Sequence, residues 1–137
     1  MRIDVVREAG VRFAATIGDH VLVFDQPVEA GGTDTGPTPT EAFVASLAGC
    51  VAYYVERFLA RHEVSAVGLR VTSEFTMASH PSRVGEVRLS IAVPVGIPTG
   101  LREPLLAVAR HCTVHNSIVA APQMLIRLEE SALVSPL

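Results

Sequence analysis

The chain has 137 residues, of which 49% are hydrophobic and 18% charged; this excludes an intrinsically disordered chain and suits a single domain over residues 1–137. The net charge is −3, only 5% of residues are aromatic and no basic cluster occurs, so no nucleic-acid partner is expected.

The N-terminal segment 1–10 is charged and lacks the apolar stretch of a signal peptide. No apolar run approaches the roughly 18 residues needed to span a bilayer, so we expect a cytoplasmic protein with no membrane partner. The mean hydropathy of +0.38 is high for a soluble monomer. We therefore expect part of the apolar surface to be buried in a homodimer.

Three short runs of strand-forming residues open the chain, and glycine or aspartate separates them. This pattern predicts a β-meander with strands over 2–8, 11–16 and 20–25. The polar, glycine-rich segment 29–37 that follows predicts a loop.

The stretch 38–62 predicts a long helix. Thr38, Pro39 and Glu41 match the N-cap, the first helical position and the third helical position of a capping box. Apolar residues then recur at spacings of three and four, which predicts one broad buried face. A second set of residues is small and predicts close packing against another helix: Ala45, Ala48, Gly49 and Ala52.

Period-two alternation predicts two more strands, over 69–77 and 86–93, which pair as an antiparallel hairpin. Residues 101–112 predict a second helix with Pro104 near its start, and 123–130 predict a final strand. The predicted order is βββ-α-ββ-α-β, an α+β fold with antiparallel sheet.

Cys50 and Cys112 are the only cysteines, and their sequence context leaves three interpretations open. In a reducing compartment they are a redox pair, ligands of a metal ion, or inert core thiols. A zinc site needs four ligands, and Cys112 lies in a short cluster with two histidines. These histidines are His111 and His115, and either Cys50 or His62 would complete the set of four.

A reactive Cys50 requires a nearby cation, because the thiolate is the nucleophilic form of cysteine. Its neighbours one helical turn away carry no positive charge, and the helix dipole acts only over the first turn. The cation must therefore come from a distant segment or from another subunit. Arg12, in the predicted meander, is the first candidate, and Arg7 is its competitor.

Three motifs in this order resemble the OsmC/Ohr family, the osmotically inducible and organic-hydroperoxide-resistance proteins. The first is GG-x₃-GPTPTE over 31–41, the second is LAGC over 47–50, and the third is HCTVHNSI over 111–118. The resemblance extends over nearly the whole chain, and the pairing of the two cysteine motifs makes it specific.

The resemblance implies an intertwined homodimer whose antiparallel sheet wraps two central helices. It also implies a thiol peroxidase acting on organic hydroperoxides, with hydrogen peroxide as a further substrate to test. Cys50 would be the peroxidatic thiolate, Cys112 would trap its sulfenic acid as a disulfide, and Arg12 would stabilise the thiolate. An external dithiol, lipoyl-type in the family, would restore both thiols, and no metal or organic cofactor is expected.

One position departs from the organic-hydroperoxide branch, which carries a glutamate ten residues before its first cysteine, paired with the arginine. Here Thr40 stands at that position, and Glu41 stands nine residues before Cys50. One residue is a rotation of about 100° on a helix, so Glu41 cannot simply replace a glutamate at position 40 unless the helix start shifts. Other branches of the family do carry glutamate nine residues before the cysteine. Glu41 is therefore a candidate both as a capping residue and as a catalytic carboxylate.

The alternative function for the whole protein is a non-catalytic protein that binds a small apolar molecule.

Overall fold

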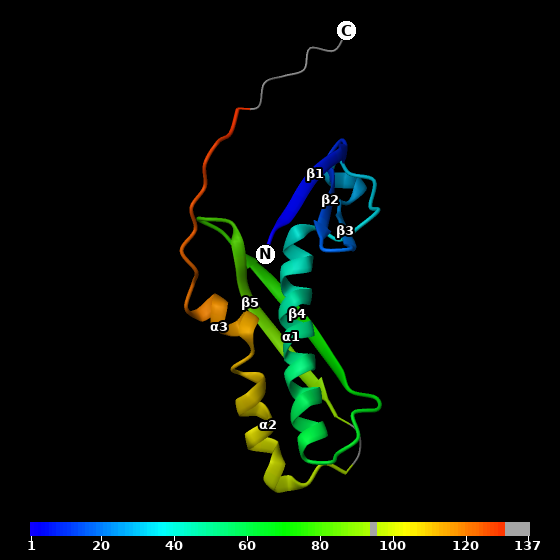
Figure 1. The fold of residues 1–137 in the computed structure, drawn as a ribbon, viewed down its shortest axis with the longest axis vertical. Coiled ribbons are helices and arrows are strands. Elements are labelled where there is room, and N and C mark those ends of the chain that lie inside the picture. The colour runs from blue at the N-terminus through cyan, green and yellow to red at the C-terminus, as the bar shows by residue number, and fades with distance from the viewer. Residues whose placement is uncertain (94–95, 131–137) are drawn as a thin grey trace.

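The N-terminal part of the chain is a three-stranded antiparallel sheet. A computed structural model describes residues 1–93 and 96–130 (Figure 1). The strands are consecutive neighbours and confirm the predicted meander: β1 (Ile3–Ala9), β2 (Arg12–Ile17) and β3 (His20–Phe24). Gly10 and Gly18 have positive φ angles at the two connecting turns, where a side chain would be strained. This sheet lies at the N-terminal end of α1 (Figure 1).

Helix α1 (Pro39–Arg61) confirms the predicted long helix and its start. The short 3₁₀ helix η1 (Val28–Ala30) and an irregular loop precede it. The Thr38 Oγ1 accepts a hydrogen bond from the Glu41 N–H at 3.1 Å, and Glu41 Oε1 accepts one from the Thr38 N–H at 2.9 Å. By length and composition alone α1 would be able to cross a membrane, a property that core helices of globular proteins share. Here its apolar face packs against protein.

The second sheet is the hairpin of β4 (Arg70–Ala78) and β5 (Arg83–Ala92). The register pairs Val71 with Ile91 and Phe75 with Val87, so the predicted alternation places one apolar face against the helices. A bulge after Thr76 shifts the register. Beyond this shift Met77 is 52% exposed, although the period-two alternation predicted over 69–77 places it on the same face as Phe75.

The second helix is shorter than predicted. After η2 (Thr99–Leu101), α2 spans Arg102–Ala109, and the chain then bends and begins α3 (Thr113–Val119). The expected helix over 101–112 was therefore wrong in its C-terminal part. Cys112 is not its last residue but the N-cap of α3, with the extended backbone angles that a cap adopts.

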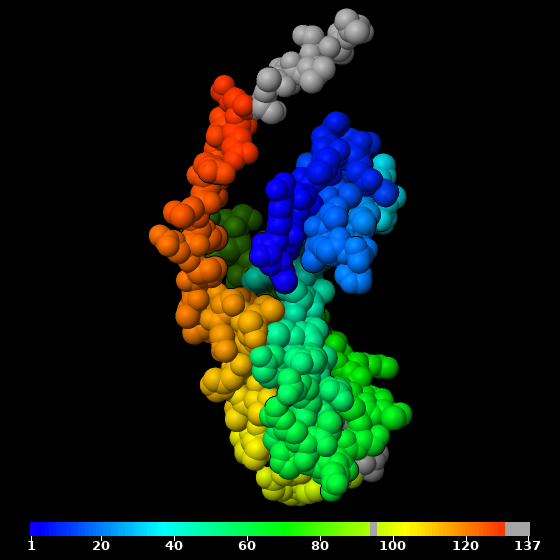
Figure 2. All heavy atoms as spheres, viewed as in Figure 1, coloured from blue at the N-terminus to red at the C-terminus, as the bar shows by residue number. Residues whose placement is uncertain are grey.

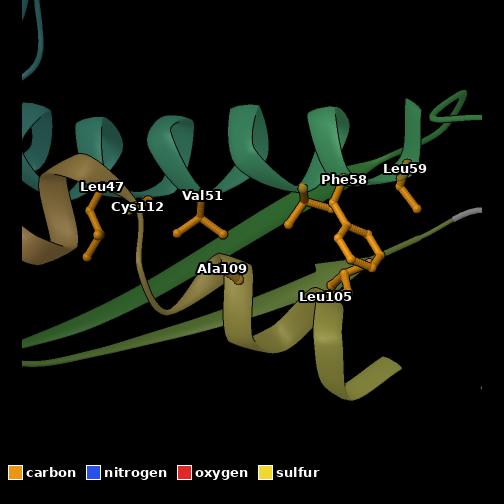
Figure 3. Packing of buried hydrophobic residues seen from close by; sticks show 8 residues of the cluster. Leu47, Val51, Phe58, Leu59, Leu105, Ala109 and Cys112 are labelled. Atoms are coloured by element: carbon orange, nitrogen blue, oxygen red, sulfur yellow. The ribbon is translucent and has the colours of Figure 1, made fainter. Parts of the chain in front are cut away.

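The core lies between α1, α2 and the β4–β5 hairpin. Figure 3 shows apolar side chains of α1 pointing toward those of α2. The buried cluster has eight members: Leu47, Val51, Val55, Phe58, Leu59, Leu105, Ala109 and Cys112. Cys112 belongs to this cluster, so the folding of the core also places one of the two thiols.

The final strand predicted over 123–130 is not formed. Residues 121–130 run as an extended, exposed segment, and Ile126 is 95% exposed. A strand exists only where its backbone groups pair with a neighbouring strand, and the described part of this chain offers none beside the segment. Figure 2 shows the segment projecting along the molecule on the opposite side from the N-terminal sheet.

The α+β class with antiparallel sheet is confirmed, as two separate sheets with helices packed on the hairpin (Figure 1). The small-residue face of α1 was expected to pack against a helix. In the single chain Ala45 and Gly49 remain exposed, because α2 packs on the larger apolar residues instead.

Candidate functional site

The fold brings Cys50 and Cys112 to the same place from opposite ends of the chain. Cys50 lies about three turns into α1 and is half-buried, whereas Cys112 is fully buried at the start of α3. The Val114 N–H donates a hydrogen bond to Cys50 Sγ at 3.5 Å, and the His115 N–H donates one to Cys112 Sγ at 3.4 Å. Consecutive amides of α3 thus each contact one sulfur. Both cysteines are present as free thiols.

The two thiols differ in environment. Burial raises the pKa of the Cys112 thiol, the His115 amide opposes this by hydrogen bonding to the sulfur, and the neighbouring Cys50 thiol raises it again. Cys112 therefore keeps its proton at neutral pH. Cys50 is the thiol that a small molecule in solvent reaches first, because Cys112 is 0% exposed.

A side-chain hydrogen bond fastens α3 beside α1 next to these sulfurs. The Tyr54 hydroxyl lies 2.8 Å from Thr113 Oγ1, one helical turn after Cys50 and one residue after Cys112. The sequence gives no local signal for this bond, because its partners are 59 positions apart.

The remaining predicted site residues lie elsewhere in the single chain. Arg12 pairs with Glu8 at 2.8 Å and donates to Thr35 Oγ1 at 2.8 Å, while Arg7 donates to the Gly10 carbonyl at 2.9 Å. Glu41 is nine residues before Cys50, about 13 Å along the helix axis. The structure therefore joins the two cysteines but brings neither the arginines nor Glu41 to them within one chain.

Glu41 takes the capping role. The Thr38 N–H, and then the Thr38 side chain, hold the pKa of the Glu41 carboxyl below its ordinary value. Its Oε1 accepts the hydrogen bond from Thr38, and the carboxylate is otherwise exposed, so a second partner can still reach it. The two roles left open by the sequence are thus compatible.

The alternative of a zinc site finds no support in the described residues, where no three His, Cys, Asp or Glu side chains are grouped to hold a metal ion. The Nδ1 atoms of His62 and His111 each lie within hydrogen-bond distance of a carbonyl of their own helix, at 2.8 Å and 2.6 Å. His115 contributes its backbone amide to Cys112, and its buried Nδ1 has no partner among the described groups.

Comparison with protein families decides the relationship. The model of the family described as OsmC-like protein matches residues 32–127, more than half of the chain and including both cysteines.

The chain belongs to the OsmC-like protein family. No curated protein matches it.

Solved structures of similar fold support the same relationship. An osmotic stress induced and detoxification response protein from Psychrobacter arcticus is 23% identical, with a TM-score of 0.78, and the match covers 84% of this OsmC-like chain and 85% of that chain. The organic hydroperoxide resistance protein OsmC from Legionella pneumophila is 22% identical, with a TM-score of 0.58 and coverage of 86% and 89%.

An organic hydroperoxide resistance protein from Vibrio cholerae, with captopril bound in one of its active sites, is 17% identical, with a TM-score of 0.65 and coverage of 88% and 86%. At these identities the likeness concerns the fold. The descriptions of these relatives associate the OsmC-like fold with stress response and hydroperoxide resistance.

Proposed function

We propose that this OsmC-like protein is a thiol-dependent peroxidase that reduces organic hydroperoxides through Cys50 and Cys112. The observation that carries the proposal is the meeting of two free thiols on adjacent amides of α3, one half-buried and one fully buried. This arrangement suits a reaction in which an oxidised sulfur is trapped by a second thiol before further oxidation.

The chemistry proceeds in three steps. The Cys50 thiolate attacks the distal oxygen of the hydroperoxide, the O–O bond breaks, and the alkoxide leaves as the alcohol after taking a proton, so that Cys50 becomes a sulfenic acid. Cys112, once deprotonated, attacks the Cys50 sulfur; the S–O bond breaks, hydroxide leaves as water, and a disulfide forms. An external dithiol then reduces this disulfide to two thiols and is itself oxidised to a disulfide.

The cation for the first step is proposed to come from a second copy of the chain. Arg12 keeps its charge in an apolar cleft and suits the thiolate and the departing oxygen. In one chain it contacts Glu8 and Thr35, so a site that uses it against Cys50 needs either a rearranged chain or a partner's arginine. The free carboxylate oxygen of Glu41 would then be a further partner for that arginine.

The exposed apolar surface favours this homodimer. Strand β1 is exposed along its whole length, and the segment 121–130 has no strand beside it. Large apolar side chains on these two segments face solvent: Ile3, Val5, Val6, Met124, Leu125, Ile126 and Leu128. Large exposed apolar side chains of this kind are often covered by a partner, and unpaired strand edges invite pairing with another chain.

Thiol titration tests the proposed activity. Fully reduced protein is mixed with an excess of cumene hydroperoxide and its free thiols are counted, with turnover followed by the consumption of an added dithiol. We expect two thiols to disappear per wild-type chain, the Cys112 thiol to persist in Cys50→Ser, and Cys50 to be oxidised without a disulfide in Cys112→Ser. Wild-type thiols that stay titratable under excess peroxide would show that the protein is not a peroxidase.

A non-catalytic binding protein is the second candidate. A hollow of about 370 Å³ lies between the start of α1 and the end of the β4–β5 hairpin, and Thr40 lines it together with the apolar side chains of Phe43, Met77 and Val84. Thr40 holds the position where the organic-hydroperoxide branch carries glutamate. Saturable binding of a small apolar probe such as 1-anilinonaphthalene-8-sulfonate, lost in Phe43→Asp, together with unreactive thiols, would favour this candidate.

A further inference from the structure

We propose that Thr35 is a positioning residue for Arg12, with its hydroxyl group oriented by the buried carboxylate of Asp25. The inference rests on the proposed function, because it concerns the arginine assigned to the peroxidase reaction. It identifies the loop before α1, rather than the strand that carries Arg12, as the element that aims the guanidinium.

Asp25 is the buried charged residue from which this arrangement starts. It follows β3, is 1% exposed, and has no cation bonded to it among the described residues. Its carboxylate instead accepts hydrogen bonds from the loop that follows: Gln26 N–H at 2.8 Å, Thr33 Oγ1 at 2.6 Å, Thr35 Oγ1 at 2.7 Å and Thr35 N–H at 3.1 Å. The hydroxyls of Thr33 and then Thr35 hold the pKa of Asp25 far below its usual range.

The charge of Asp25 determines the direction of the next hydrogen bond. An ionised carboxylate only accepts, so Thr35 must use its single hydroxyl proton on Asp25. The lone pairs of Thr35 Oγ1 are then available to a donor, and Arg12 Nη1 donates to this oxygen at 2.8 Å. The chain of donation runs from Arg12 through Thr35 to Asp25, and the reverse direction is excluded because arginine has no acceptor.

The glycine-rich loop is folded tightly enough to hold Thr35 in place. A Cβ atom at Gly32 would collide with the carbonyl of Gln26, and one at Gly36 would lie 2.5 Å from the carbonyl of Val23. Only glycine fits at these two positions. The Asp25 N–H also donates to the Pro37 carbonyl at 3.1 Å, which closes the loop just before α1 begins.

Arg12 is consequently held on one side and free on the other. Its Nε donates to Glu8 Oε1 at 2.8 Å and its Nη1 to Thr35. A guanidinium has five N–H donors, so these two contacts fix its plane and leave further donors for an anion. Pre-orientation of this kind lowers the cost of ordering a long side chain when the thiolate or the peroxide oxygen is bound.

Paired threonine variants separate positioning from loop stability. Thr35→Val removes the hydroxyl that contacts both Asp25 and Arg12. Thr33→Val removes a hydroxyl bonded to the same carboxylate but not to Arg12. Thr35→Ser retains the hydroxyl and serves as the rescue variant, and Thr35→Ala is the second choice if Thr35→Val does not fold.

Two quantities are measured in each variant and in wild type, once circular dichroism and thermal unfolding have shown that the variants are folded to the same extent as wild type. The first is the ¹⁵N order parameter of the Arg12 Nε, which does not depend on activity. The second is kcat/KM for cumene hydroperoxide. We expect Thr35→Val to lower the Arg12 order parameter and to reduce kcat/KM at least about tenfold, the factor that corresponds to losing one hydrogen bond to a charged group. Thr35→Ser should restore both quantities.

The outcomes for the two proposals are distinguishable. An Arg12 order parameter that is the same in Thr35→Val, Thr33→Val and wild type overturns the positioning role, even if the protein is a peroxidase. A wild-type protein that consumes no peroxide overturns the proposed function. In that case a fall in the Arg12 order parameter confined to Thr35→Val still supports the positioning of Arg12 by Thr35.

Discussion

Replacing Thr38 by alanine tests whether the capping box holds the helix that carries Cys50. The variant loses the Oγ1 acceptor of the 3.1 Å bond from the Glu41 N–H and leaves a helix-terminal amide unpaired. Loss of an N-cap hydroxyl costs about 1 kcal/mol of unfolding free energy, which lowers the melting temperature of a domain of this size by about 4 °C. Cys50 lies three turns further on, so peroxide-dependent thiol loss should persist. An unchanged melting temperature would refute the capping argument.

Glu41→Gln separates the capping role from a catalytic one. The folded-state pKa of Glu41 is lowered, so its charge contributes stability above the unfolded pKa of about 4.3, and that contribution disappears as pH falls through the folded value. We expect the variant to melt below wild type at pH 7 and to match it in acid. Glu56→Gln, at an exposed position of the same helix, is the control. A normal melting curve with peroxide turnover reduced more than about a hundredfold would instead show that the carboxylate acts in the reaction.

Three other predictions concern the core, the thiols and the assembly. Leu59→Ala, at a side chain that is 0% exposed, should lower the free energy of unfolding in urea by about 3 kcal/mol, and a loss below about 1 kcal/mol would contradict its place in the core. The alkylation of Cys112 by iodoacetamide can be followed by mass spectrometry in Cys50→Ser. Because the pKa of Cys112 is raised, its alkylation rate should reach half of its maximum at a higher pH than the rate of an ordinary cysteine. A midpoint at or below the ordinary pH would contradict the buried environment. Light scattering should give twice the mass of one chain, and Ile126→Asp, on the exposed terminal segment, should lower it; a wild-type monomer at micromolar concentration would contradict the proposed homodimer.

The local elements of this protein could be predicted because their determinants lie within a few residues of one another. Thr38 and Glu41 specify the start of α1 through bonds across three positions, and alternation specifies the strands of the hairpin within each strand. The two cysteine motifs, taken with their order in the chain, were sufficient to indicate the family. For such features the sequence already contains both partners of the interaction, so no long-range information is required.

Other features depended on contacts between distant segments. The break between α2 and α3, which makes Cys112 a cap, accompanies the packing of α3 on α1 through Tyr54 and Thr113. Arg12 donates a hydrogen bond to Thr35, and Thr35 donates one to Asp25, so that these bonds join three segments of the N-terminal half. The strand predicted over 123–130 has the right pattern of residues, but a pattern cannot supply the neighbouring backbone with which a strand must pair.

The sequence by itself determined where α1 begins, the approximate place of the meander and hairpin strands, which family the chain resembles, and which two thiols to compare. Only the tertiary structure decided that these thiols meet on adjacent amides of α3, and that Arg12 is held both by Glu8 of β1 and by Thr35 of the loop before α1. The physical reason is that a hydrogen bond acts over about 3 Å of space, whatever the separation of its partners in the chain.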